Sequence, residues 1–103
     1  MTPSIALPEA CATMGELREA IDALDANLVT MLALRQRYIE RAAALKRTRD
    51  AVRDEARIEE VVRHVVAEGK SAGLSPAIAE SVWRALIEAS IAHEYETFDA
   101  KGP

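Results

Sequence analysis

Arg35 and Lys46 are the first candidates for chemistry, because both face the apolar side of a predicted helix. Arg35 interrupts a series of apolar residues spaced alternately by four and three positions, which is the spacing of a helix seam. Lys46 follows 11 residues later, about three full turns, and therefore points the same way. Two inward cations are costly unless an anion lies between them. A carboxylate of Asp50, Asp54 or Glu94 could supply it, and so could a bound dianion.

A second polar interruption lies in the last predicted helix. Ser90 and Glu94 are one turn apart and share a face, and Glu94 stands between Ile91 and Tyr95 on the apolar side. Burial there favours the neutral acid. A neutral acid, unlike a carboxylate, can donate a hydrogen bond. A salt bridge from Glu94 to Lys46 or to an arginine is the structural alternative, and a serine in a helix can simply bond its own backbone.

The remaining basic residues are concentrated in the middle of the chain. Nine of the 13 lysines and arginines lie between positions 35 and 63, although the net charge is −4. Arg57 opens the second predicted helix and Arg18 lies beside the seam of the first. Four further arginines are assigned to a solvated face. They are Arg37, Arg41, Arg47 and Arg49.

Several function classes are disfavoured by composition. The acidic net charge argues against a nucleic-acid partner, and no apolar run is long enough for a membrane span. His64 and His93 are predicted surface histidines. The single cysteine, Cys11, cannot form an internal disulfide and is interpreted as a bystander thiol. No secretory leader, metal cluster or glycine-rich phosphate loop is recognised, so we expect a cytoplasmic protein without a cofactor.

Alanine, leucine, glutamate and arginine dominate the chain, which favours an all-α fold. The first helix is predicted to begin at Thr13, which with Glu16 has the form of a capping box. It continues to about Thr48 without a glycine or proline after the first turn. The second covers about 55–69, with Gly69 as its stop.

Ser75 is the predicted N-cap of the third helix, with Pro76 at its first position. This helix is expected to continue to about Asp99. Residues 1–12 are interpreted as an extended N-terminal arm and residues 101–103 as a tail.

Each helix has a predicted apolar face. The first presents Leu17, Ile21, Leu24, Leu28, Met31, Tyr38, Ala42 and Leu45; the second Ile58, Val61, Val62, Val65 and Val66; the third Ile78, Val82, Trp83, Leu86, Ile87, Ile91, Tyr95 and Phe98. The first helix, roughly 50 Å long, is too long for the other two to cover at every level. A second copy of the same helix would cover it, so we infer an intertwined homodimer.

Over about residues 11–99 the chain resembles the all-helical class of chorismate mutases. The resemblance rests on the segments 17–25, 34–38 and 52–57, on Lys46, and on the turn from Ser90 to Glu94. It implies the type II fold of that class, in which three-helix chains with a long first helix form an intertwined homodimer. Residues 13–100 would then be one chorismate mutase domain, with each active site shared between two chains.

The implied activity is the rearrangement of chorismate to prephenate, an isomerase step of the shikimate pathway toward Phe and Tyr. It is concerted and needs no cofactor. An enzyme accelerates it by holding a dianion in a folded shape and by stabilising the charge that grows on the ether oxygen.

The resemblance also assigns roles to individual residues. Arg35, Arg57 and, from the partner chain, Arg18 match carboxylate-binding arginines, for which the planar guanidinium is suited. Lys46 matches the cation at the ether oxygen, Asp54 a residue near the substrate hydroxyl, and Ser90 a minor carboxylate contact.

Two positions depart from the usual pattern of that family. Glu94 stands where many members have Gln, and Glu can donate to the ether oxygen only when protonated, so we expect more activity on the acid side of neutrality. Ile58 stands where a Glu often contacts the ring hydroxyl. Isochorismate-pyruvate lyases share the fold and the cations and also lack that Glu, which makes them the alternative. They have Gln at the position of Glu94, so the mutase is preferred.

A helical interaction module without catalysis is a third hypothesis. The heptad seam alone would support it, but the inward Arg35 and Lys46 would then have no purpose.

Overall fold

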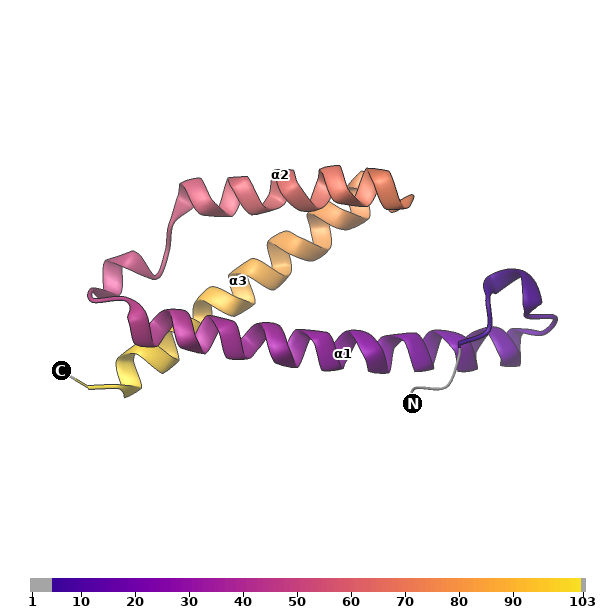
Figure 1. Cartoon of the computed structure of the whole chain (residues 1–103), viewed down its shortest axis with the longest axis horizontal. Helices are drawn as coiled ribbons and strands as arrows, with labels where there is room; N and C mark the ends of the chain where they lie inside the picture. Colours follow the sequence, from indigo (N-terminus) through magenta and orange to yellow (C-terminus); the bar gives the residue numbers. More distant parts are fainter. Residues whose placement is uncertain (1–4, 103) are drawn as a thin grey trace. The chain divides into compact units, whose positions relative to one another are not determined.

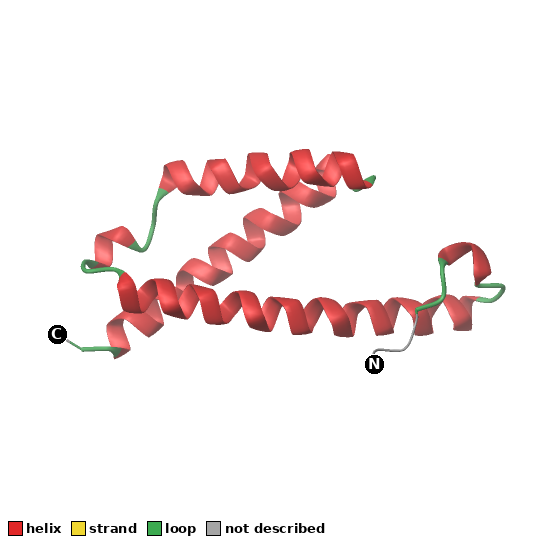
Figure 2. Cartoon of the chain, in the orientation of Figure 1, coloured by secondary structure: helices red, strands yellow, loops and turns green. Residues whose placement is uncertain are grey.

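The computed structural model describes residues 5–102, and all of their regular structure is helical. Figure 1 shows the order of the elements and Figure 2 the absence of strands from this part of the chain. The bounds are η1 Pro8–Ala10, α1 Met14–Leu45, η2 Arg49–Ala51, α2 Glu55–Ala72 and α3 Pro76–Ala100. The all-α prediction with a long first helix is confirmed. The chain divides between Arg37 and Tyr38 into two compact units.

The N-terminal arm agrees only in part with its prediction. Pro8–Ala10 form a short 3-10 helix, so the arm is not extended throughout as predicted, because proline fixes a φ that suits the first helical position. The part of the arm prediction that concerns residues 1–4, like residue 103 of the tail, lies outside the described residues. Cys11 is half-buried, and its thiol donates to the Leu7 carbonyl at 3.7 Å.

The capping box at the start of α1 is confirmed. The Thr13 hydroxyl accepts a hydrogen bond from the Glu16 N–H at 3.1 Å, and the Glu16 carboxylate accepts from the Ala12 N–H at 3.0 Å. These bonds satisfy backbone donors that have no partner inside the helix. The local sequence is therefore sufficient to begin α1 at Met14.

Most of the predicted seam of α1 in the first unit is exposed in a single chain. Ile21, Leu24, Leu28 and Met31 are 47–64% exposed, although they repeat at alternating spacings of three and four on one face. Such a continuous apolar stripe is unusual on the surface of a monomer.

The end of α1 comes at Leu45, three residues before the predicted position. The Lys46 N–H still bonds to the Ala42 carbonyl at 3.0 Å, but Thr48 is extended and η2 follows. Val52, immediately after η2, is only 4% exposed and belongs to the core. Burial of Val52 is obtained only if the chain leaves the axis of α1 before Thr48.

The helices α2 and α3 form a hairpin, which is visible as the pink-to-yellow part of Figure 1. The predicted stop at Gly69 is wrong: α2 continues to Ala72, and Gly73, at φ 85°, is the left-handed residue that ends it. Gly69 is buried, and a Cβ there would lie 3.5 Å from Ala79 and from Leu74. It permits close packing within the hairpin. Ser75 caps α3 as predicted, accepting from the Ile78 N–H.

The apolar core of the second unit lies between α2, α3 and the residue after η2. Its buried members are Val52, Ile58, Val62, Ile87 and Ile91, with Val61, Val66, Trp83, Tyr95 and Phe98 packed against them. Ile78 and Val82, on the predicted apolar face of α3, are 54% and 49% exposed in the single chain. Near the turn between α2 and α3, the residue of α3 that lies against Gly69 is Ala79, which is fully buried.

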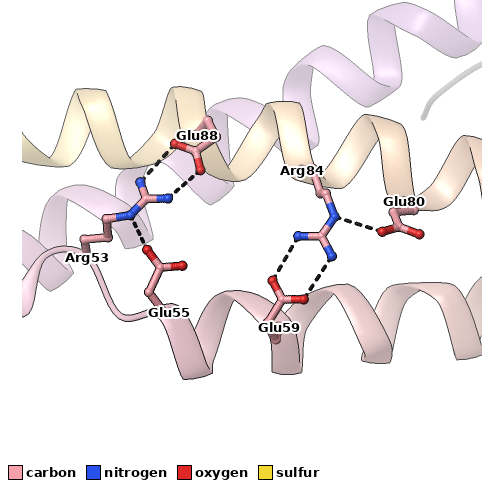
Figure 3. A network of polar contacts seen from close by, with 6 residues as sticks. All are labelled: Arg53, Glu55, Glu59, Glu80, Arg84 and Glu88. Carbon is pink, nitrogen blue, oxygen red and sulfur yellow. Dashed lines mark hydrogen bonds and ion pairs between the residues drawn. The ribbon is translucent and has the colours of Figure 1, made fainter.

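Two arginines tie α3 to α2 and to the loop before it on the outside of the core (Figure 3). Arg53 donates to both oxygens of Glu88 at 2.8 and 3.0 Å, and Arg84 donates to both oxygens of Glu59 at 2.9 and 3.0 Å. The hydrogen bonds from the guanidinium groups hold the pKa of Glu88 and of Glu59 below the usual value. All these groups are partly exposed, so each pair makes a small contribution to stability.

Candidate active site

The most buried charged group lies in an ion pair at the end of α1. The Nζ of Lys46 donates to the Oε2 of Glu94 at 2.7 Å, and Glu94 is 4% exposed. The same ammonium lies 3.4 Å from the Val52 carbonyl oxygen. Of the anions that the sequence offered to Lys46, the structure brings Glu94 to it, so the salt-bridge alternative is the arrangement found.

The local fold explains why these two side chains meet. Lys46 is the first residue beyond α1, where the chain turns toward η2. Glu94 lies on the buried face of α3, one turn after Ser90, which is half-buried. A buried carboxylate is tolerated because it is paired with a cation at hydrogen-bond distance. Lys46 keeps 29% of its side chain exposed, so an anion can reach the ammonium from solvent.

A second polar group lies at the start of α2. Asp54 is the N-cap, and its Oδ1 accepts from the Arg57 N–H at 3.1 Å. The guanidinium of Arg57 pairs with Glu60 on the next turn, and its side chain is 61% exposed. Asp54 therefore has a structural role that the sequence reading missed, although its place before a helix was a visible sign of it.

Ile58 has no polar function in this arrangement. It is 7% exposed and packs in the core with Val52 and Val62. Its aliphatic side chain cannot bond a hydroxyl, and its burial gives it a packing role.

The two remaining predicted arginines belong to the first unit. Arg18 is exposed on the first turns of α1, and Arg35 is half-buried further along the same helix. Lys46, Asp54, Arg57, Ser90 and Glu94 belong to the second unit.

One predicted surface histidine is instead half-buried and bonded. The Nε2 of His93 lies 2.7 Å from the Oε2 of Glu40, so the prediction for His93 is corrected; His64 is exposed as predicted. The residues around His93 in the sequence gave no indication of this partner, which lies 53 residues earlier.

The C-terminal end of α3 supplies contacts that the sequence reading did not identify. Lys101 donates from Nζ to the backbone carbonyls of Ala43 and Lys46, at 2.8 and 2.7 Å. Arg49, assigned to a solvated face, pairs with Asp99 at 3.0 Å and lies over the Tyr95 ring. The hydrogen bond that Arg49 donates to Asp99 raises the pKa of Arg49, which stays charged. The position of Lys101, a basic residue directly after the last helix, could have indicated a contact with backbone carbonyl groups.

Neither a metal cluster nor a membrane span is found within residues 5–102. No three His, Cys, Asp or Glu side chains in that range are grouped to hold a metal ion. Likewise, none of the described helices combines the length and apolar character required to cross a bilayer.

A comparison with protein families identifies the family of this chain. A family model described as chorismate mutase type II matches residues 17–95, a range that includes every predicted site residue from Arg18 to Glu94. No curated protein matches the chain.

Proposed function

The chain belongs to the chorismate mutase type II family, and from this membership we propose that it converts chorismate to prephenate. The observation that carries the proposal is the ammonium of Lys46 held beside the buried carboxyl group of Glu94. The proposal places the protein in the cytoplasm, in the shikimate pathway toward Phe and Tyr.

The proposed reaction is intramolecular and conserves all atoms. The ether C–O bond breaks while a new C–C bond forms, and negative charge grows on the ether oxygen. Lys46 stabilises that charge as a hydrogen-bond donor, which acts more strongly in the transition state than in the ground state. Glu94 donates the second hydrogen bond when it carries a proton. No cofactor enters the step.

Binding of the two substrate carboxylates is assigned to arginines. Arg35 and Arg57 act from one chain and Arg18 from its partner, because a guanidinium can donate two parallel bonds to a carboxylate. Ser90 adds a minor contact to a carboxylate. Asp54 accepts from the substrate hydroxyl while it continues to cap α2.

The shared site requires the homodimer, which is part of the proposal. Its support is the exposed stripe of Ile21, Leu24, Leu28 and Met31 on α1. A second copy of α1 presents the same stripe and would bury both, in the symmetric manner of a two-fold interface.

Isochorismate-pyruvate lyase activity is the second candidate. The observation that favours it is Ile58, which is buried where many mutases have a glutamate. Because no acid at that position can bond the ring hydroxyl, the protein would discriminate less between chorismate and isochorismate, whose hydroxyl groups stand at different ring positions.

The test is an assay of the purified protein with chorismate and, separately, with isochorismate. Identification of the products distinguishes the candidates. Formation of prephenate from chorismate supports the mutase. Formation of salicylate and pyruvate from isochorismate, with no conversion of chorismate, supports the lyase. A folded protein that consumes neither substrate would contradict both and leave a non-catalytic helical dimerisation module.

A further inference from the structure

The backbone of Lys46 is bonded to a residue outside the proposed active site. An α-helix leaves its last carbonyl groups without partners inside the helix. At the end of α1, the ammonium of Lys101 donates to the carbonyls of Ala43 and Lys46, at 2.8 and 2.7 Å. A cation at this position also interacts favourably with the negative end of the helix dipole. Figure 1 shows the end of α3 beside the end of α1.

These bonds hold the peptide unit from which the Lys46 side chain extends. Lys46 is already outside α1, so fewer helical bonds hold it than hold the residues before it. Its N–H bonds to Ala42 at 3.0 Å, and its carbonyl bonds to Lys101. Both backbone polar groups of Lys46 are therefore fixed, while its ammonium is fixed by Glu94 and Val52.

Lys101 is itself held in place by α3. Its N–H bonds to the Phe98 carbonyl at 3.2 Å, and its ammonium lies 4.1 Å from the centroid of the Phe98 ring. Phe98 packs against the core. Lys101 follows Glu94 by seven residues, about two helical turns, so both lie on the same side of the α3 axis. The helix α3 thus contacts Lys46 at the side chain through Glu94 and at the backbone through Lys101.

We propose that Lys101 is a positioning residue that keeps the ammonium of Lys46 at the place where the ether oxygen of the substrate is bound. The inference rests on the proposed function for its catalytic consequence. Its physical basis is that electrostatic stabilisation requires a donor already aligned with the developing charge. When the carbonyls of Ala43 and Lys46 lose their donor, the last turn of α1 frays and the ammonium moves.

Arg49 offers a matched control. It joins the same end of α3 to η2 through Asp99, at 3.0 Å, and through the Tyr95 ring, at 4.3 Å. It therefore contributes one positive charge and a cation–π contact, as Lys101 does. These contacts of Arg49 are with the side chains of Asp99 and Tyr95, whereas Lys101 bonds to the backbone of Lys46.

The experiment compares K101M, K101R and R49M with the wild-type protein, all shown by circular dichroism to be folded at the assay temperature. For conversion of chorismate to prephenate, K101M is expected to lower kcat about tenfold with KM within about twofold, because a misplaced group costs mainly the chemical step. K101R, which retains a donor, should recover most of the rate. R49M should keep kcat within about twofold of the wild type.

A second readout does not depend on turnover. Hydrogen exchange of the Lys46 amide, measured by NMR, should accelerate severalfold in K101M and stay unchanged in R49M. A folded K101M with wild-type kcat and wild-type exchange overturns the inference, as does an equal loss in R49M. If the wild-type protein makes no prephenate, the proposed function and the catalytic consequence fail together, whereas the exchange result still decides whether Lys101 anchors Lys46.

Discussion

The Lys46 ammonium lies 2.7 Å from the Glu94 carboxylate, although the two residues are 48 positions apart and Glu94 is almost fully buried. The pair joins the end of α1 to the middle of α3. It also places the only buried charged side chain among the described residues next to a cation that keeps partial access to solvent. This combination is suited to receiving a polar atom of an anionic ligand between two groups, with Lys46 donating in every state and Glu94 donating only when it carries a proton.

The donor role proposed for Glu94 gives a testable pH dependence. We expect kcat of the wild-type protein to be higher at pH 5 than at pH 8, because the carboxylate of Glu94 cannot donate to the ether oxygen. The variant E94Q has an amide donor at every pH, so its profile should be flat over that range. E96Q, on an exposed position of the same helix, is the control and should keep the wild-type profile. Equally flat profiles for the wild type and E94Q would contradict the role assigned to protonated Glu94.

Arg35 distinguishes an enzyme from a dimerisation module. In R35A, a charged contact to a substrate carboxylate is lost, so kcat/KM should fall. The fall should correspond to a rise of roughly 2–4 kcal/mol in the activation free energy. The free energy of unfolding should change little, because the Arg35 side chain is only half-buried. Steady-state kinetics and urea unfolding measure the two quantities. R37A, at an exposed position of α1, is the matched control. Unchanged kinetics in R35A would remove Arg35 from the site.

The exposed stripe of α1 predicts how the chain associates. Leu28 is 53% exposed in the single chain and lies at the centre of that stripe. In L28E a charge would be buried between two copies of α1, so sedimentation equilibrium should show a shift from dimer to monomer. T30E, about 200° further around the helix, should leave the association unchanged. A wild-type protein that sediments as a monomer would contradict the shared site.

The pairing of Glu88 with Arg53 predicts a loss of stability in acid. The hydrogen bonds from Arg53 hold the pKa of Glu88 below its ordinary value of 4.5. A carboxyl group with a lowered pKa in the folded state stabilises the fold above the ordinary value, and this contribution is lost as the pH falls through the folded value. The free energy of unfolding of E88Q should therefore be lower than that of the wild type at about pH 7. The difference between the two should shrink as the pH falls below about 4.5. Urea midpoints at several pH values test this, with E68Q on α2 as the control. A difference independent of pH would contradict it.

Features that depend on a few neighbouring residues were predictable from the sequence. The capping box of Thr13 and Glu16 and the cap at Ser75 follow from side-chain bonds that span three or four positions. The all-α class follows from composition and apolar spacing. The resemblance to chorismate mutases came from ordered cations, and the family match over residues 17–95 confirms it.

Features that depend on packing between helices were decided only by the tertiary structure. Gly69 and Gly73 are both reasonable helix stops in sequence, but α2 continues through Gly69 because Ala79 approaches it closely, and Gly73 takes the left-handed conformation. The choice of Glu94 as the partner of Lys46 has the same origin. Lys101 reaches the Lys46 carbonyl across 55 residues of sequence, and such a contact exists only once α3 has packed against the end of α1.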